Sequence, residues 1–418
     1  MRRYVLAPRP DHERNAQDYF VYDLALSHGL TLLRNDVREN RYPNVASPPA
    51  LIVSHNPDHL ADARLIAAWG SSRNVPIVLH LHCHYGYYPA HGTTDASWFS
   101  NRENIELCLR HAQAVVVPTR FMVDDLKSHI PNLRSDLRFE VVSNGARKSL
   151  YYPSTFDRRR EFRTDVAKIA DLADQRAIPQ DRKLVGFVGR VENGKGLQLL
   201  EALAAAHAGG KHLGDVCLLV QFRFQPDSAE HEACMKNAIR LRDRNKDFIR
   251  IYPDLAPRAT DRPMRHFDLL LLPSLSEVQP MVVLEALSCG VPVVVTRSTR
   301  FYDELEKLNF SATEFAAVDL PERFGDGSAG LAELEVADNP ARIAQDLIDA
   351  IRRVPRSDDA QRLALSNKAD LAGFSDTTMY QRHLRVYDDV VESLARCRSE
   401  PVAPSGSSVR VTPATSGL

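Results

Sequence analysis

The chain has 418 residues, which is long for one compact core and favours two or three domains. Lys and Arg number 53 against 54 Asp and Glu, and this balance disfavours a protein whose main partner is nucleic acid. No apolar run approaches the roughly 18 residues that a membrane-spanning helix needs, and no signal-peptide core follows the N-terminal Met. The six cysteines are scattered without a CxxC pair, which indicates reduced thiols. We therefore expect a cytoplasmic protein without a transmembrane segment, for which peripheral membrane contact stays open.

The N-terminal part of the chain alternates short apolar runs with helical patterns. Unbroken apolar runs are typical of strands buried on both faces, as in a parallel sheet covered by helices. The predicted strands are residues 4–7, 30–33, 50–53, 76–79, 114–117 and 139–142. We assign residues 1–150 to a first Rossmann-like domain.

The segment at residues 151–180 differs because it holds no strand-like run. We predict a linker and a helix there. Its basic cluster at residues 158–163 begins with Arg158-Arg159-Arg160, and we interpret these as a solvated helix face rather than a binding patch. Their role stays open.

The alternation then resumes, and residues 181–375 are predicted to form a second doubly wound domain. Its expected strands are residues 184–188, 216–220, 248–251, 269–272 and 291–295. Asn339 followed by Pro340 predicts a helix start. A last helix is expected over residues 376–399, before a disordered tail at 400–418. The fold class is α/β, with two Rossmann-like domains and a ligand cleft between them.

Glu277 and Glu285 flank the predicted start of a helix that follows the strand at 269–272. Pro280 suits the first turn of this helix, and free N–H groups at a helix start suit a phosphate. Two acids so placed can accept hydrogen bonds from sugar hydroxyls. The alternative is that Glu285 faces solvent and that Glu277 is a first-turn acid favoured by the helix dipole.

A second segment, residues 186–196, runs from a predicted strand into a loop with Arg190 and Lys195. Arg offers a planar fork and Lys a mobile charge, and a pyrophosphate can use both. The order of a Walker loop is absent, which disfavours a P-loop nucleotidase. The alternative is an exposed basic turn.

His80, His82 and His84 alternate at the end of the strand at 76–79 and would share one face. Three interpretations remain: a metal site, structural histidines, or a cleft histidine. Neither a carboxylate nor a fourth ligand is close in sequence, so we predict no metal.

Together the two segments resemble the donor-binding domain of the family 4 retaining glycosyltransferases, which have the GT-B fold. That family carries a G-R-x(3-4)-K-G loop and two glutamates with seven residues between them. The corresponding residues here are Gly189-Arg190, Lys195-Gly196, and the pair Glu277 and Glu285. The resemblance covers roughly residues 76–395. It also includes an "NG" element at Asn144, and a final helix that crosses back onto the N-terminal domain.

The resemblance implies a role for each matching position. Arg190 and Lys195 would neutralise the donor diphosphate, and Glu285 would hold the ribose. Glu277 would contact the transferring sugar, and His82 would touch that sugar or the acceptor. Catalytic positions are thus Glu277, Arg190, Lys195 and His82. Backbone N–H groups of Met281, Val282 and Val283 would face phosphate, and the acceptor side of the cleft would include His80, His84, Thr119 and Asn144.

The implied activity is transfer of a sugar from a UDP-, GDP- or ADP-sugar to a glycan, lipid or small molecule. The anomeric configuration would be retained, without a metal or other cofactor. Two alternatives remain: a catalytically silent nucleotide-sugar-binding protein, and a nucleotide-sugar epimerase on a related fold.

The chain also departs from the family pattern. Residues 8–15 contain no glycine where the family has a Gly-rich loop near the acceptor. Val278-Gln279 replaces a Gly-containing pair and is expected to narrow the space beside the donor sugar. Other usual glycines are missing at 221–223 and 298–300. These changes weaken any inference about the sugar.

Overall fold

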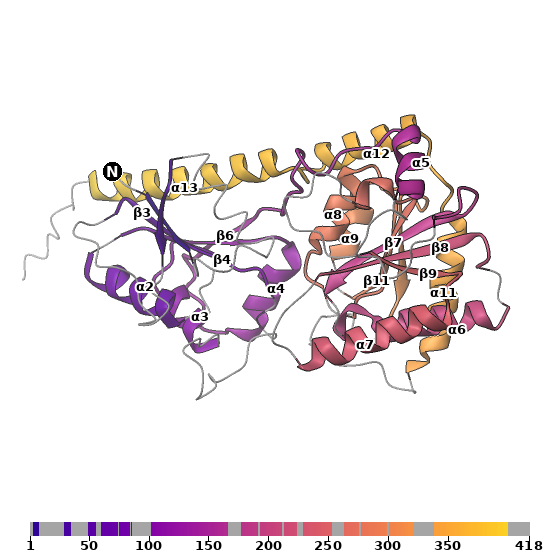
Figure 1. The fold of residues 1–418 in the computed structure, drawn as a ribbon. Coiled ribbons are helices and arrows are strands. Elements are labelled where there is room, and N and C mark those ends of the chain that lie inside the picture. Colours follow the sequence, from indigo (N-terminus) through magenta and orange to yellow (C-terminus); the bar gives the residue numbers. More distant parts are fainter. Residues whose placement is uncertain are drawn as a thin grey trace, which may run out of the picture.

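A computed structural model of the chain shows two α/β halves, each built on a six-stranded parallel sheet (Figure 1). The structure describes residues 3–7, 29–34, 49–55, 60–73, 75–83, 85, 102–165, 177–190, 193–210, 213–223, 229–252, 263–275, 277–298, 301–321 and 338–399. The expectations for residues 8–15 and for the tail at 400–418 lie outside these ranges.

The N-terminal sheet has the strand order β2-β1-β3-β4-β5-β6. Its strands are β1 Arg3–Ala7, β2 Thr31–Arg34, β3 Leu51–Ser54, β4 Ile77–His80, β5 Ala114–Val117 and β6 Arg138–Val141. Helices α2 Leu60–Arg73, α3 Arg102–Leu109 and α4 Arg120–His129 pack against it. Every residue of β3, β4 and β5 is buried, as their unbroken apolar runs predict. The expectation of burial on both faces is wrong for β6, because β6 is the edge strand and its ends are exposed.

The C-terminal sheet has the order β12-β11-β10-β7-β8-β9. Its strands are β7 Lys183–Arg190, β8 Val216–Arg223, β9 Ile249–Tyr252, β10 Leu269–Leu272, β11 Val293–Arg297 and β12 Phe315–Asp319. Its helices are α6 Leu197–Ala208, α7 Ala229–Arg244, α8 Met281–Ser288, α9 Phe301–Lys307, α11 Pro340–Arg353 and α12 Asp359–Leu371. Short 3-10 turns are η3 Asn193–Lys195 and η4 Pro263–His266. Apolar side chains of α8 and of α6 belong to two separate core clusters, so the sheet is covered on both faces.

The basic cluster of the linker is only partly a solvated face, and this corrects the prediction. It lies in helix α5, Phe156–Asp165, where Arg158 is exposed but Arg159 and Arg163 are buried. Arg163 Nη2 lies 2.5 Å from Asp268 Oδ2, so this arginine ties the linker helix to the C-terminal sheet.

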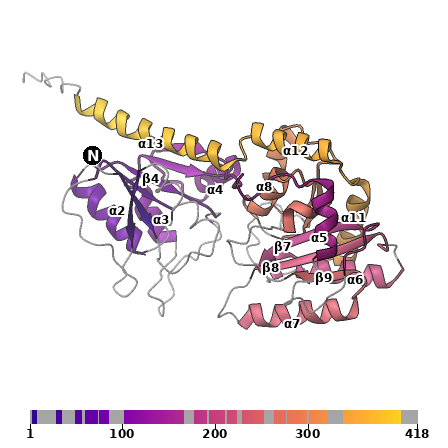
Figure 2. The same cartoon turned by 45° about the horizontal axis from the view of Figure 1, so that its top comes forward.

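Helix α13, Asp376–Ser399, leaves the C-terminal half and runs along the N-terminal sheet (Figures 1 and 2). Its buried residues Met379, Val386, Tyr387 and Val390 share one core cluster with residues of β3, β4 and β5. None of the helices in the described ranges is both long and apolar enough to cross a bilayer.

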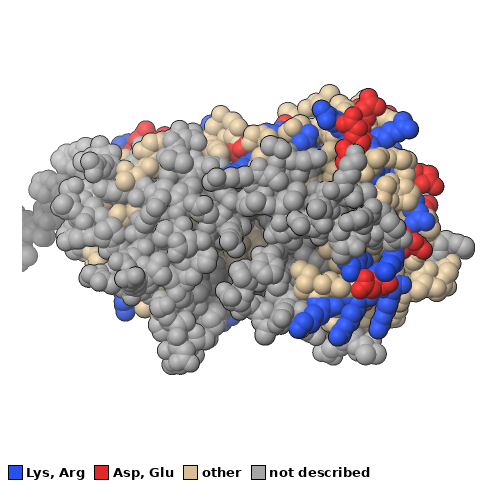
Figure 3. Space-filling model, viewed as in Figure 1, with Lys and Arg blue, Asp and Glu red and all other residues tan. Residues whose placement is uncertain are grey.

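Basic side chains gather over α7, at the lower right of Figure 3. Its exposed members include Lys236, Arg240 and Arg244, interspersed with exposed Asp243. The opposite side of the helix packs on the core through buried Ala238. This is the pattern of a solvated helix face.

Candidate functional site

Lys195 and Glu277 meet at the carboxyl edge of the C-terminal sheet. Strands β7 and β10 are parallel neighbours, so the loops that follow them leave the same edge. Lys195 ends η3 after β7, and its Nζ lies 2.7 Å from Glu277 Oε1. The two side chains are 17% and 12% exposed. The alternative of an exposed basic turn therefore does not hold for Lys195.

Backbone contacts hold these two loops together. Leu275 N donates to Gly194 O at 2.8 Å. Gly196 has φ 81, and a Cβ there would lie only 1.9 Å from Pro273 O. Glycine is required for both reasons, because other residues rarely adopt this backbone and none would fit. The order Lys-Gly thus has a structural cause.

The helix after Glu277 begins at Met281, with Pro280 as its N-cap rather than in its first turn. Glu285 is on this helix and is 4% exposed. The alternative of a solvent-facing Glu285 and a first-turn Glu277 is therefore wrong, since Glu277 precedes the helix and Glu285 is buried.

The three backbone amides expected to face phosphate are not equivalent. Val283 N already donates to Pro280 O at 3.0 Å. Met281 and Val282 occupy the first positions of α8, where N–H groups have no partner within the helix. These two remain the candidate phosphate donors.

Of two further predicted site residues, one is placed by its backbone alone and the other is not described. The backbone of Arg190 ends β7 and is paired with Arg223 of β8, whereas its side chain is outside the described part of the structure. His84 is also outside the described ranges.

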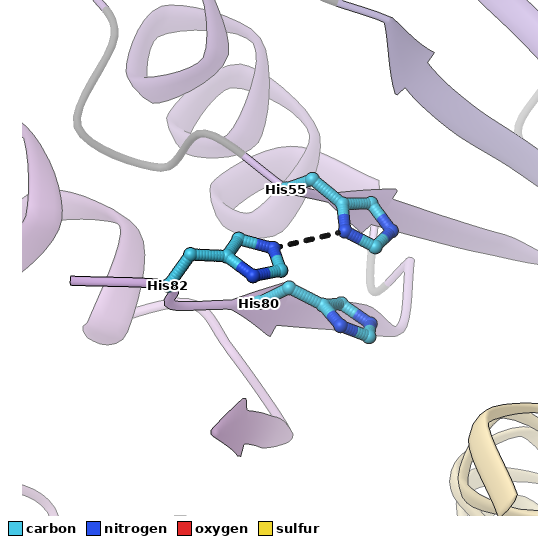
Figure 4. A group of neighbouring side chains, drawn as sticks. All are labelled: His55, His80 and His82. Atoms are coloured by element: carbon cyan, nitrogen blue, oxygen red, sulfur yellow. Dashed lines mark hydrogen bonds between the residues drawn. The ribbon is translucent and has the colours of Figure 1, made fainter. Parts of the chain in front are cut away.

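A cluster of histidines forms where β3 and β4 end, in which His55 and His80 are buried and His82 is half-buried (Figure 4). His80 ends β4, and its ring stacks on that of His55, with centroids 4.0 Å apart and planes at 22°. His55 Nδ1 lies 3.3 Å from His82 Nε2. From α13, the Tyr387 hydroxyl is 2.9 Å from His80 Nε2, and the His383 ring stacks on the His80 ring with centroids 4.8 Å apart.

One candidate ligand atom from each of His55, His80 and His82 can be chosen so that all lie within 4.8 Å of one another. A metal must lie in the plane of each imidazole, about 2 Å from its nitrogen. The rings of His55 and His80 are stacked with their planes inclined by only 22°, so these planes meet far beyond that reach. The described geometry is that of a hydrogen-bonded stack.

Burial keeps these histidines uncharged at neutral pH. It lowers the pKa of His55 and His80 well below 6.5, and that of His82 and His383 to about 4. Neighbouring histidines lower the pKa of His55, His80 and His82 further. Because its Nε2 contacts His55, a neutral His82 can offer its Nδ1, as donor or acceptor according to the tautomer, to a ligand.

Thr119 and Asn144 follow the neighbouring strands β5 and β6. Thr119 is fully buried, and its hydroxyl has no hydrogen-bond partner among the described residues. Asn144 N donates to the side chain of Gln279, which comes from the C-terminal half. The two residues therefore lie at the junction of the halves.

Val278 and Gln279 do not act as predicted. Val278 packs against the core of the N-terminal half, and the Gln279 amide hydrogen-bonds to that half. The prediction that Gln279 narrows the space beside the donor sugar is corrected by these contacts, since its amide is turned toward the N-terminal half.

Sequence reasoning missed His55, Gln279 and His383 as members of these contacts. His55 directly follows β3, the neighbour of β4, so a search for polar residues after every predicted strand would have found it. Gln279 was noted only as a replaced glycine. His383 carries no local signal, because its position depends on where α13 docks.

The sequence matches two family models, one in each half. Residues 4–145 match the glycosyl transferase 4-like domain, and residues 168–342 match glycosyl transferases group 1. With the two-domain fold and the paired loops, these matches place the chain among the group 1 glycosyltransferases of the GT-B fold. It belongs to that family, and the predicted fold class is confirmed. No curated protein matches the chain by sequence.

Solved structures with the same fold include several glycosyltransferases. Sucrose-phosphate synthase from Thermosynechococcus elongatus is 15% identical, with a TM-score of 0.62 over 94% of this chain and 100% of that chain. HepE of Anabaena in complex with UDP-glucose is 16% identical, with a TM-score of 0.58 over 94% and 99%. A glycosyltransferase from Rickettsia africae is 11% identical, with a TM-score of 0.60 over the same shares. At these identities the likeness concerns the fold.

Proposed function

We propose that this glycosyltransferase moves a sugar from a nucleoside diphosphate sugar to an acceptor with retention of configuration and without a metal ion. The observation that carries the proposal is the contact between Lys195 and Glu277. It brings a cation for the diphosphate and an acid for the sugar to one sheet edge. The start of α8 and buried Glu285 lie in the segment that follows.

The proposed chemistry assigns each group to one part of the donor. Negative charge grows on the diphosphate as its bond to the sugar breaks, and Lys195 and Arg190 stabilise that charge. The N–H groups of Met281 and Val282 contribute at the helix start. Glu285 accepts hydrogen bonds from the ribose, and Glu277 accepts one from a sugar hydroxyl.

The N-terminal half provides the acceptor side in this proposal. His82, uncharged because burial lowers its pKa to about 4, reaches the sugar or the acceptor from the end of β4. Thr119 and Asn144 lie after β5 and β6 at the same sheet edge. The acceptor class remains a glycan, a lipid or a small molecule.

UDP-glucose is the first donor to test, since HepE of the same fold is described in complex with it. A thermal-shift screen of UDP, GDP, ADP and their sugars should show stabilisation by one nucleotide. A ligand at 100 times its Kd adds about 2.7 kcal/mol to the free energy of unfolding. No shift with any nucleotide would count decisively against the donor site.

A nucleotide-release assay, with NMR of the anomeric proton, then tests the reaction. We expect slow donor hydrolysis without acceptor, a retained anomeric configuration and rates unchanged by EDTA. Binding without turnover would identify a silent nucleotide-sugar-binding protein. A new sugar epimer still attached to the nucleotide would identify an epimerase.

A further inference from the structure

Gln279 connects the two halves of the molecule through a buried amide. Its Oε1 accepts from Asn144 N at 2.7 Å, and its Nε2 donates to Ser143 Oγ at 2.9 Å. The same nitrogen lies 3.4 Å from Pro118 O. We call Gln279 with Pro118, Ser143 and Asn144 the Gln279 cluster.

The partners of Gln279 all come from the N-terminal half, at its carboxyl sheet edge. Pro118 directly follows β5, and Ser143 and Asn144 follow β6. Gln279 itself belongs to the loop between Glu277 and α8. The cluster therefore joins the cleft-facing loops of the two sheets.

Burial makes this contact costly to break. Gln279 is only 7% exposed, and its amide satisfies a backbone N–H and a backbone carbonyl as well as a hydroxyl. A buried polar group that loses its partner incurs the full cost of desolvation. The halves therefore separate at this point only if water replaces all three contacts.

The cluster also restrains Glu277. Glu277 and Gln279 are two residues apart, and a two-residue segment spans at most about 7 Å. If the N-terminal half moved away and Gln279 stayed bound to it, Glu277 would therefore be pulled out of place. Val278, between them, packs on the N-terminal core and reinforces the link. The position of Glu277 thus depends on the N-terminal half, whereas Lys195, Glu285 and the start of α8 all belong to the C-terminal half.

We propose that Gln279 is a positioning residue, which couples the engagement of the N-terminal half to the placement of Glu277 against the donor sugar. The nucleotide binds to the C-terminal half whether or not the cluster is formed. The sugar is correctly contacted only when the cluster is intact. The activity part of this inference rests on the proposed transferase function.

The test uses Gln279→Leu, which keeps the approximate size but removes every hydrogen bond. Gln279→Glu is the conservative variant, because a carboxylate still accepts from Asn144 N–H and can accept from the Ser143 hydroxyl once that hydroxyl turns away from Asn144 O. Glu304→Ala is the matched control, since Glu304 Oε1 accepts from Arg120 N at 2.8 Å and bridges the same halves from α9 rather than from the loop that holds Glu277 and Gln279.

Three measurements are made on the full chain. Hydrogen exchange at the Asn144 amide should be about tenfold faster in Gln279→Leu, the effect of losing one hydrogen bond of roughly 1.4 kcal/mol. The Kd for UDP should change by less than about threefold, and kcat should fall about tenfold or more. Gln279→Glu should restore much of the exchange protection at Asn144 and much of kcat. Glu304→Ala should change neither of these two quantities.

Unchanged exchange at Asn144 in Gln279→Leu would overturn the cluster, irrespective of activity. Faster exchange with an unchanged kcat in an active enzyme would overturn the positioning role. If the wild-type chain turns over no donor, the transferase proposal fails, while the exchange result still decides whether the cluster holds the halves together. Should Gln279→Leu not fold, Gln279→Asn withdraws the same amide by one methylene and is judged by the same outcomes.

Discussion

Lys195 and Glu277 are 82 residues apart in sequence and form a hydrogen-bonded ion pair. Each side chain is mostly buried, so neither charge is well solvated without the other. A donor diphosphate that binds here offers Lys195 a second anionic partner. The contact with Glu277 therefore holds the Lys195 cation at the sheet edge where we propose that the diphosphate binds.

Lys195→Ala should reduce turnover by about 100-fold, which is typical for removal of a group that stabilises charge in the transition state. The Kd for nucleotide should rise much less, because Glu285 and the helix start remain. Steady-state kinetics and calorimetry with the nucleotide measure the two effects.

Lys368→Ala is a matched control for that variant. Lys368 forms an ion pair of 2.6 Å with Glu314 in the same half and is remote from the loop of Glu277 in sequence. Turnover should stay at the wild-type level. Turnover that is unaffected by Lys195→Ala would contradict the role assigned to this lysine.

At the scale of elements, the start of α11 shows how a local signal determines a boundary. Asn339 adopts the left-handed region, with φ 53, and its side chain accepts from Arg342 N. Pro340 takes the first helical position, where it has no N–H to satisfy. The helix then buries Ile343, Leu347 and Ile351 against the C-terminal sheet.

Two substitutions separate the contribution of the Asn339 side-chain cap to stability from that of its left-handed backbone. Asn339→Ala should lower the free energy of unfolding by about 2 kcal/mol, of which about 1 is the lost cap and about 1 is the left-handed backbone. Asn339→Gly should lower the free energy of unfolding by only a few tenths of a kcal/mol, because glycine adopts this backbone freely. Urea denaturation gives both values, and equal losses would show that backbone conformation is unimportant here.

At the scale of the whole molecule, α13 joins the chain's last helix to its first sheet. His383 and Tyr387 of α13 contact His80 of β4 in a buried histidine stack. Such a stack is most stable while the rings are uncharged, because protonation would place a positive charge in a buried site, and burial lowers the pKa of both His80 and His383. Docking of α13 should therefore depend on pH.

The sign of that dependence follows from His383. Burial lowers its pKa to about 4 in the folded protein, against about 6.5 when unfolded. Between these values the unfolded chain binds more protons, so stability falls as the pH is lowered from about 6.5 toward 4. His383→Phe keeps a ring in the stack and should reduce the pH dependence by about one proton per molecule.

Urea denaturation at several pH values between 4.5 and 8 measures this slope. Above pH 7.5 the difference between His383→Phe and the wild type should be constant, since His383 is neutral in both folded and unfolded states. A variant whose slope equals that of the wild type below pH 6.5 would show that His383 titrates freely in the folded protein.

The sequence by itself determined the fold class and the candidate donor-side residues. Buried parallel strands read as unbroken apolar runs, and the Lys-Gly loop, the two acids and the helix start are local patterns with local physical causes. Edge strands are harder to predict: the sequence patterns do not indicate β12, whose two middle alanines are only partly buried and whose last residue is exposed, and they predict burial on both faces for β6, whose ends are exposed.

Only the tertiary structure decided how the halves meet. The Gln279 amide reaches residues 135 and 136 positions away, and Tyr387 reaches His80 across 307 positions. No periodicity or motif encodes such partners, because each depends on the packing of a whole domain or helix. The burial of Glu285 and the stacking of the histidines follow from that packing as well. They decide between the alternative interpretations that the sequence leaves open for these residues.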